Sequence, residues 1–209
     1  MKGLVLDWGG VLTNGIDAAF ASWAQRDGVI ADHLGLVLRE AFTSDDADDP
    51  NPVHALERGE IDAAQFESRL AAELARRGSA VPAQGLLARM FAGISPSDSM
   101  LGLVARVKQA GLRTAVLSNS WGNSYPMQGW DELFDAVVIS GEVGMRKPEP
   151  RIFRHVLGLI GLSASECVFV DDLAHNVTAA VELGFVGIVH RSYDETALEL
   201  EAILGLSLR

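Results

Sequence analysis

Several short apolar runs of this chain end directly in polar residues. The residues that follow them carry hydroxyl, amide or carboxylate groups: Asp7 after residues 4–6, Ser118 and Asn119 after residues 115–117, and Asp171 and Asp172 after residues 168–170. Apolar runs without polar alternation are typical of parallel strands that are covered on both faces. Because the carboxyl ends of such strands meet at one edge of a sheet, where ligands bind, the pattern predicts an α/β protein with a site at that edge.

The order of the expected elements indicates the fold class. Runs of branched apolar residues predict strands at residues 4–6, 114–117, 136–139, 168–170 and 186–189. Amphipathic segments of helical length lie between the later runs. One carries Ile152, Val156 and Ile160, another spans residues 174–183, and each is followed by a glycine as a stop signal. Strands and helices that alternate in this way predict a doubly wound parallel sheet.

The stretch at residues 15–94 differs from the rest, because it shows helical periodicity without convincing strands. Apolar side chains recur there with the spacing of a packed helix face, as at Phe66 and Leu70. We therefore expect an inserted helical subdomain at residues 15–94. The α/β core would then consist of residues 1–14 and 95–209.

Two features of the insertion carry further expectations. The acidic turn at residues 44–50 is interpreted as a solvated loop rather than a metal site. The chain crosses between core and insertion near Asn14 and Gly15 and again near Ser95 and Pro96. Two crossings of this kind can act as a hinge, and closure would exclude water during a reaction.

Composition narrows the classes of function. The 209 residues carry a formal net charge of -11 without a cluster of Lys and Arg, so no nucleic acid partner is expected. Asp7 interrupts the first apolar stretch, which indicates neither a secretory signal nor a membrane span. The single cysteine, Cys167, excludes an intrachain disulfide and is interpreted as a small buried residue, so a reducing, cytoplasmic location is expected. No Gly-x-Gly-x-x-Gly follows a strand, so no dinucleotide is implied.

Asp7 is the candidate nucleophile, because a carboxylate can attack phosphorus and form an aspartyl-phosphate. A helix cap after the strand is the alternative interpretation of this residue. Gly9 and Gly10 allow the backbone to turn tightly and to approach a ligand closely. Trp8 is expected either to line the pocket or to pack in the core.

Three residues of the later segments are candidates for binding phosphate. Ser118 and Asn119 can direct a hydroxyl and backbone N–H groups at phosphoryl oxygens, although both residue types are also common in turns and N-caps. Lys147 precedes Pro148 and Pro150, which can hold it as an inward-pointing cation rather than a solvated side chain. Its task would be to neutralise charge on the nucleophile and on the phosphoryl group.

Asp171 and Asp172 are adjacent carboxylates, which repel each other unless a cation or hydrogen bonds compensate. A few hard oxygen ligands suit Mg²⁺, which keeps several waters and shares the phosphate of the substrate. Asn176, one helical turn farther on, can orient one of these carboxylates. A helix start, where negative charge is favourable, is the alternative interpretation of the pair.

In this order and strand context the segments resemble the four motifs of the haloacid dehalogenase-like (HAD) hydrolase superfamily. The motifs are residues 7–11 (Asp-Trp-Gly-Gly-Val, a DxGGV form), residues 117–119 (Leu-Ser-Asn), Lys147 with Pro148, and residues 170–172 (Val-Asp-Asp) with Asn176. The resemblance covers nearly the whole chain and implies a Rossmann-like core. The insertion resembles the α-helical cap of the subfamily I type, which shapes the substrate pocket, and residues 56–61 look like a recurring piece of such caps.

The resemblance implies three kinds of role for residues of these motifs. The catalytic residues would be Asp7, as nucleophile, Ser118 and Lys147. The substrate phosphate would contact Gly9, Gly10, Ser118, Asn119 and Lys147. Magnesium would be held by Asp7, Asp172 and the backbone carbonyl of Gly9, with Asp171 and Asn176 in support.

One departure from the family pattern concerns the general acid. Phosphatases of the family usually carry a second aspartate two residues after the nucleophile, and this chain has Gly9 there. General acid-base catalysis is typically worth about 10² to 10⁴ in rate. We therefore expect slow turnover of substrates with poor leaving groups, and the smallest loss for a sugar 1-phosphate or an acyl phosphate.

The leading hypothesis is a magnesium-dependent phosphatase of a small phosphorylated metabolite, with a sugar phosphate as one candidate, acting as a monomer or homodimer without a membrane partner. A 2-haloacid dehalogenase would use the same aspartate without a metal. A phosphotransferase would pass the phosphoryl group to another hydroxyl. A HAD-like scaffold that lost its chemistry at Gly9 would serve in binding or regulation.

Overall fold

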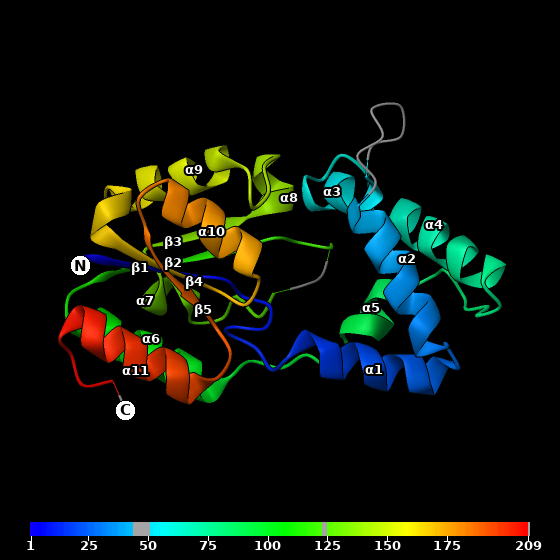
Figure 1. Ribbon diagram of the computed structural model, residues 1–209, viewed down its shortest axis with the longest axis horizontal. Helices are drawn as coiled ribbons and strands as arrows, with labels where there is room; N and C mark the ends of the chain where they lie inside the picture. The colour runs from blue at the N-terminus through cyan, green and yellow to red at the C-terminus, as the bar shows by residue number, and fades with distance from the viewer. Residues whose placement is uncertain (44–50, 123–124, 209) are drawn as a thin grey trace.

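Five parallel strands form one sheet at the centre of the core (Figure 1). The computed structural model describes residues 1–43, 51–122 and 125–208. The strands follow the spatial order β3-β2-β1-β4-β5, with bounds β1 Gly3–Leu6, β2 Arg113–Ser118, β3 Ala136–Ile139, β4 Cys167–Asp171 and β5 Val186–Val189. Each predicted strand is therefore confirmed, and β1, β2 and β4 are longer than predicted.

Helices cover both faces of this sheet, as Figure 1 shows. Leu4 and Leu6 of β1 point into a hydrophobic cluster with α6 (Asp98–Gln109) and α11 (Tyr193–Leu204). Val5 points to the opposite face, into a cluster with α9 (Pro150–Ile160) and α10 (Ala174–Glu182). Successive side chains of a strand alternate between faces, so a continuous apolar run is buried on both sides. The doubly wound α/β fold is confirmed.

The strand order reverses between β1 and β4. β1 pairs with β2 on one side, and after β3 the chain crosses back to place β4 on the other side of β1. The backbone N–H of Asp7 donates to the carbonyl of Val170 at 2.9 Å, so Asp7 and Asp171 emerge side by side. Ligands of open α/β sheets bind at such a reversal, outside the carboxyl ends of the strands.

Helices α1 to α5 lie to one side of this sheet edge, on the right in Figure 1. Their bounds are α1 Ile16–Asp27, α2 Ala31–Thr43, α3 Pro52–Glu57, α4 Ala63–Arg76 and α5 Leu86–Phe91. They bury a separate hydrophobic cluster that includes Trp23, Phe66, Leu70 and Leu74. Phe66, Leu70 and Leu74 are buried along α4, as their spacing predicts. The predicted acidic turn at residues 44–50 lies outside the described residues.

The two chain crossings run side by side and are bonded to each other. Thr13 and Pro96 form an antiparallel bridge, and the Asn14 N–H donates to the carbonyl of Ser95 at 3.0 Å. The Asn14 side chain accepts from the Ser95 N–H at 2.8 Å and donates to the carbonyl of Gly93 at 2.9 Å. Hinge motion at this point stays a prediction.

Smaller elements complete the core. Two single-turn helices, α7 (Trp130–Leu133) and α8 (Ser140–Val143), and a short 3-10 turn, η1 (Ala164–Glu166), lack the length that periodicity can reveal. Cys167 is buried in β4, as predicted, and burial raises the pKa of its thiol to about 11. Within residues 1–43, 51–122 and 125–208, no helix is long and apolar enough to cross a membrane.

A glycine of β5 tests how tightly α10 packs on the sheet. A Cβ at Gly187 would lie 2.5 Å from a methyl of Val177 and 2.7 Å from a methyl of Val181. We expect Gly187→Ala to lower the free energy of unfolding by about 1–3 kcal/mol, as overpacking of a core does. Denaturant titration measures this change.

The control is Gly158→Ala, at an exposed position of α9 with no neighbouring atom within 4 Å of the added Cβ. Alanine is the better helix former, so this variant should gain about 0.5–1 kcal/mol. Equal effects of the two substitutions would contradict the close approach of α10 and β5.

Candidate active site

A buried lysine joins two carboxylates at the reversal of the sheet. The Lys147 Nζ lies 2.8 Å from Oδ1 of Asp7 and 2.6 Å from Oδ2 of Asp171. The Lys147 side chain is 1% exposed, and Asp171 is fully buried. The structure thus brings together three residues that the sequence placed on three separate segments, and Lys147 points inward rather than into solvent.

Asn119 fixes the backbone at Lys147. Its side-chain amide donates to the Lys147 carbonyl at 3.0 Å and accepts from the Lys147 N–H at 2.8 Å. Both ends of this amide are therefore occupied by the lysine backbone, although Asn119 also lines the cavity above the site. A phosphate contact of Asn119 has the backbone N–H and the second N–H of the amide as donors, and that contact stays a prediction.

Asp171 is surrounded by donors. Besides Lys147, it accepts from the Leu173 N–H at 2.9 Å and from the Asn176 amide at 3.1 and 3.2 Å. These bonds occupy both carboxylate oxygens and fix the loop that leads into α10. The Asn176 carbonyl oxygen Oδ1 is buried without a hydrogen-bond partner among the described residues.

The two glycines after Asp7 make room for other parts of the site. Gly10 adopts a φ of 73°, and a Cβ at this residue would overlap the carboxylate of Asp172. A Cβ at Gly9 would lie 2.9 Å from Cδ1 of Ile16 in the first turn of α1. A larger side chain at Gly10 would displace Asp172, and one at Gly9 would displace the end of the Ile16 side chain.

The carboxylates of Asp7, Asp171 and Asp172 each place an oxygen within 4.8 Å of the others. Burial, with repulsion from Asp171 and Asp172 and against the attraction of Lys147, raises the pKa of Asp7 to about 7. Burial and repulsion from Asp171 raise the pKa of Asp172 to about 6. Burial alone would lower the pKa of Lys147, but Asp171 and Asp7 outweigh it and hold that pKa above its usual range.

This donor set fits a small divalent cation. It consists of hard oxygen atoms, carries more negative charge than Lys147 neutralises, and holds two carboxylates whose charged forms are disfavoured until a cation compensates them. Asp171 is committed to Lys147, Leu173 and Asn176, so Asp7 and Asp172 are the better placed of the three for direct ligation.

A cavity of about 290 Å³ opens above these residues, and a second of about 580 Å³ adjoins it. Ser118, which is buried, contributes its hydroxyl to the first and shares a hydrogen bond of 3.0 Å with the hydroxyl of Tyr125. Trp8 packs on Trp130 with ring centroids 4.7 Å apart, and it also lines both cavities. Both interpretations of Trp8 are therefore correct.

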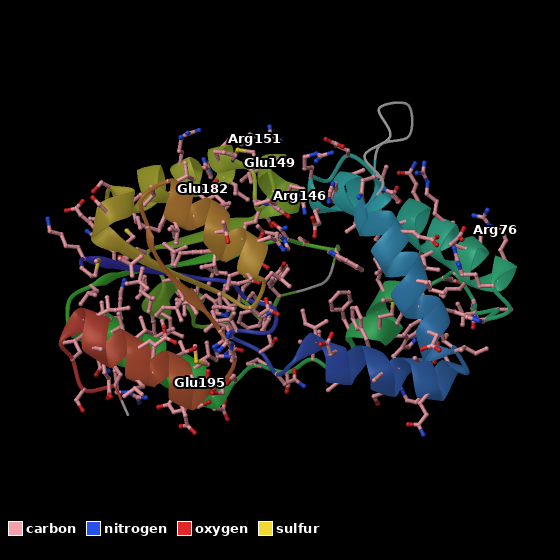
Figure 2. All side chains as sticks on the ribbon, in the orientation of Figure 1. Arg76, Arg146, Glu149, Arg151, Glu182 and Glu195 are labelled. Atoms are coloured by element: carbon pink, nitrogen blue, oxygen red, sulfur yellow. The ribbon has the colours of Figure 1, made fainter. Side chains whose placement is uncertain are left out.

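A buried ion pair, which the sequence did not identify, joins the helical part to the core. Arg146 Nε lies 2.5 Å from Glu57 Oε2, and both side chains are at most 9% exposed. The indole N–H of Trp121 donates to the other oxygen of Glu57 at 3.1 Å. Glu149 pairs with Arg58 at 3.3 Å, and Figure 2 shows Arg146 and Glu149 on the side of the core that faces α3. Two features of the sequence could have pointed to this ion pair. Arg146 is adjacent to Lys147, and Glu57 lies within residues 56–61, which resemble a recurring piece of caps.

The ion pair can be tested by removing one partner. We expect Glu57→Ala to lower the free energy of unfolding by about 3–5 kcal/mol, because it leaves the Arg146 guanidinium buried and unpaired. Denaturant titration of the single variants and of the double variant Glu57→Ala/Arg146→Met measures the coupling. The double variant should be more stable than Glu57→Ala, and strict additivity of the two single effects would show that the pair does not interact.

The burial of Asp7, together with repulsion from Asp171 and Asp172, predicts a pH-dependent cost of stability. The folded pKa of about 7 exceeds the ordinary value of 3.8, so the folded protein loses stability as pH rises through that window and bears the full cost above pH 7. Asp7→Asn should therefore raise the thermal midpoint in EDTA at pH 8 by at least about 3 °C, the shift that 1 kcal/mol produces at this chain length.

The gain should shrink at pH 5, where Asp7 is mostly protonated in the folded state. The exposed Asp131 provides the control, and Asp131→Asn should change the midpoint little at either pH. A gain from Asp7→Asn that is as large at pH 5 as at pH 8 would contradict the raised pKa.

Comparison with known proteins identifies the family to which this chain is similar. The haloacid dehalogenase-like hydrolase family matches residues 1–184. Sesquiterpene phosphatase astK of Aspergillus oryzae is 32% identical over 155 residues, which cover 71% of this chain and 77% of that protein. Acyl-CoA dehydrogenase family member 10 of Mus musculus is 30% identical over 216 residues, 99% of this chain and 19% of that protein. The chain thus spans about a fifth of the length of the mouse relative.

A solved structure has the same fold. It is a HAD family enzyme from Bacteroides thetaiotaomicron in complex with magnesium and inorganic phosphate, and it matches with a TM-score of 0.66 at 23% identity. The match covers 91% of this chain and 94% of that chain. The arrangement of the parallel sheet and its helices is therefore that of the family.

Proposed function

Because the chain belongs to the haloacid dehalogenase-like hydrolase family, we propose that this hydrolase is a magnesium-dependent phosphatase of small phosphorylated metabolites, with Asp7 as its nucleophile. The observation that carries the proposal is the buried Lys147, held between Asp7 and Asp171 beneath a cavity of about 290 Å³. Sesquiterpene phosphatase astK among the relatives, and magnesium with inorganic phosphate bound to a structural neighbour, support it.

The geometry of Asp7 suits an in-line attack on phosphorus. Its Oδ1 accepts from the Trp8 N–H at 2.7 Å and from Lys147 at 2.8 Å, which fixes the carboxylate and leaves Oδ2 as the attacking atom. The bond from Oδ2 to phosphorus forms while the bond from phosphorus to the leaving oxygen breaks. Lys147 compensates negative charge on Asp7 and on the phosphoryl group, and the Ser118 hydroxyl donates to a phosphoryl oxygen.

A second displacement returns the enzyme to its starting state. The oxygen of a water molecule attacks phosphorus, the bond from phosphorus to Asp7 breaks, and inorganic phosphate leaves. Gly9 offers no side chain to protonate the first leaving group or to deprotonate the water. Solvent has to carry these protons, so leaving groups that are stable as anions react fastest.

We assign the magnesium site to Asp7, Asp172 and the backbone carbonyl of Gly9, with Asp171 and Asn176 in support. When bound, magnesium supplies positive charge that stabilises the transferring phosphoryl group. The chain's own contribution is to place the carboxylates: Gly10 leaves space for Asp172, and Asn176 orients Asp171.

We assign residues 15–94 as a cap of the subfamily I type over a core of residues 1–14 and 95–209. The separate hydrophobic cluster of α1 to α5 supports the division, as do the paired crossings at Asn14 and Ser95. In this proposal the cap closes over Asp7 and excludes water until the phosphoryl group has been transferred. The first motif is assigned to the DxGGV form.

Two alternatives rest on particular observations. Haloacid dehalogenases occur among the matching proteins, and Asp7 would serve as the nucleophile in that reaction too. The clustered Asp7, Asp171 and Asp172 favour the phosphatase instead, because a dehalogenase has no use for an acidic metal site. The second alternative, a scaffold that only binds, rests on Gly9 in place of the general acid.

Phosphate release tests the proposal directly. With p-nitrophenyl phosphate and a panel of metabolite phosphates, we expect release that requires magnesium, stops with EDTA, and falls by at least about 10³-fold in Asp7→Asn, because the nucleophile is removed. The exposed Asp131→Asn should keep the wild-type rate. Tight binding of a phosphate without release would support the scaffold, and halide release from a 2-haloacid in EDTA would support the dehalogenase.

A further inference from the structure

The wall of the active-site cavity opposite the carboxylates is apolar and largely aromatic. Phe20 and Phe91 of the helical part stack edge to face with ring centroids 5.3 Å apart. Trp121 lies beside them, with its centroid 6.4 Å from Phe20 and 6.1 Å from Phe91. These three rings are only partly buried, and all of them line the 290 Å³ cavity that also contains Asp7.

Among the described residues, several polar groups of the same wall are bonded within the protein. The Glu57 carboxylate binds Arg146 and the Trp121 indole. The Asn119 amide binds the backbone of Lys147, and the Ser118 hydroxyl shares its hydrogen bond with Tyr125. A substrate hydroxyl placed against the rings of Phe20, Phe91 and Trp121 would stay unpaired, which costs free energy.

The apolar wall continues away from the carboxylates into the second cavity. The two cavities share Trp8, Phe91, Ile94 and Tyr125. In the second cavity Glu67 is the acidic residue of the wall, and its two oxygens accept from the backbone N–H groups of Gly85 and Leu87 at 3.0 and 2.9 Å. Asp17 and His175 also line the 290 Å³ cavity, but both are exposed. These two polar residues therefore lie at the solvated rim of the cavity rather than in its apolar wall.

We propose that the substrate is a phosphate ester of a hydrocarbon-rich, uncharged alcohol or phenol, whose apolar part lies against Phe20, Phe91 and Trp121. The inference rests on the proposed phosphatase function and narrows its substrate class. Burial of hydrocarbon against the aromatic wall supplies binding free energy, whereas a sugar would leave its hydroxyl groups unpaired. A sugar phosphate, expected from the sequence as one candidate, does not suit this wall.

The test uses phenyl esters whose leaving groups have nearly the same acidity. This is necessary because Gly9 provides no general acid, so the rate of turnover depends on the acidity of the leaving group. The substrates are phenyl phosphate and its 4-ethyl, 4-butyl and 4-hexyl derivatives, with 4-propylphenyl and 4-(2,3-dihydroxypropyl)phenyl phosphate as a matched pair. We expect kcat/KM to rise by about threefold for each added methylene until the cavity is filled. The dihydroxypropyl ester should fall at least about tenfold below the propyl ester.

Variants connect the preference to the aromatic wall. Phe91→Ser should reduce the advantage of the hexyl ester over phenyl phosphate by at least about tenfold, and Phe91→Leu by less, because leucine restores part of the apolar surface. The control is Leu198→Ser, at a position of α11 that is 56% exposed, and it should keep the wild-type preference.

The outcomes separate the two proposals. Release from phenyl phosphate without a gain along the alkyl series would overturn the apolar substrate class and leave the phosphatase in place. Absence of release from every ester would overturn the phosphatase. In that case calorimetric titration of Asp7→Asn with the same esters still measures how strongly their alkyl groups bind to the aromatic wall. An affinity that does not rise with the length of the alkyl group would overturn the inference independently of turnover.

Discussion

The charged lysine between Asp7 and Asp171 is the interaction on which the candidate site depends. An ammonium group that is 1% exposed is stable only if carboxylates compensate the loss of hydration, and here two of them lie within 2.8 Å. The arrangement in turn requires that β1 and β4 are neighbours, because only then do Asp7 and Asp171 emerge together. The topology of the sheet is therefore a condition for the electrostatics of the site.

Lys147 can neutralise only one of the three carboxylates of Asp7, Asp171 and Asp172. The excess negative charge explains the other features of the site. The pKa values of Asp7 and Asp172 are raised because burial and mutual repulsion disfavour their charged forms. Donors from Leu173 and Asn176 stabilise Asp171, which leaves the excess charge on the side of the cavity where Asp7 and Asp172 lie. A site of this kind is prepared for positive charge.

The sequence predicted those parts of the molecule that local patterns determine. Strands appear as apolar runs because both faces of the sheet are covered, and the polar residues at the ends of β1, β2 and β4 mark the site. The partners within the site could not be predicted in the same way. The phosphate contact expected of Asn119 stays a prediction, but no local pattern revealed that its side chain bonds the backbone of Lys147, which lies 28 residues away in the chain. The pair of Glu57 and Arg146 spans 89 residues, and no periodicity encodes a contact at that separation.

The contacts between the helical part and the core differ in what opening would cost. If the helical part rotates about the crossings at Asn14 and Ser95, as we propose, the hydrogen bonds that join these crossings would change little. The ion pair of Glu57 and Arg146 joins the helical part to the core and would be separated by such a rotation. Its loss is less costly than its geometry suggests, because both ions regain hydration when they separate. Opening would expose the apolar surface of a bound hydrocarbon to water, and this exposure is unfavourable. The burial of a hydrocarbon against Phe20, Phe91 and Trp121 would therefore favour the closed arrangement more strongly than the ion pair does.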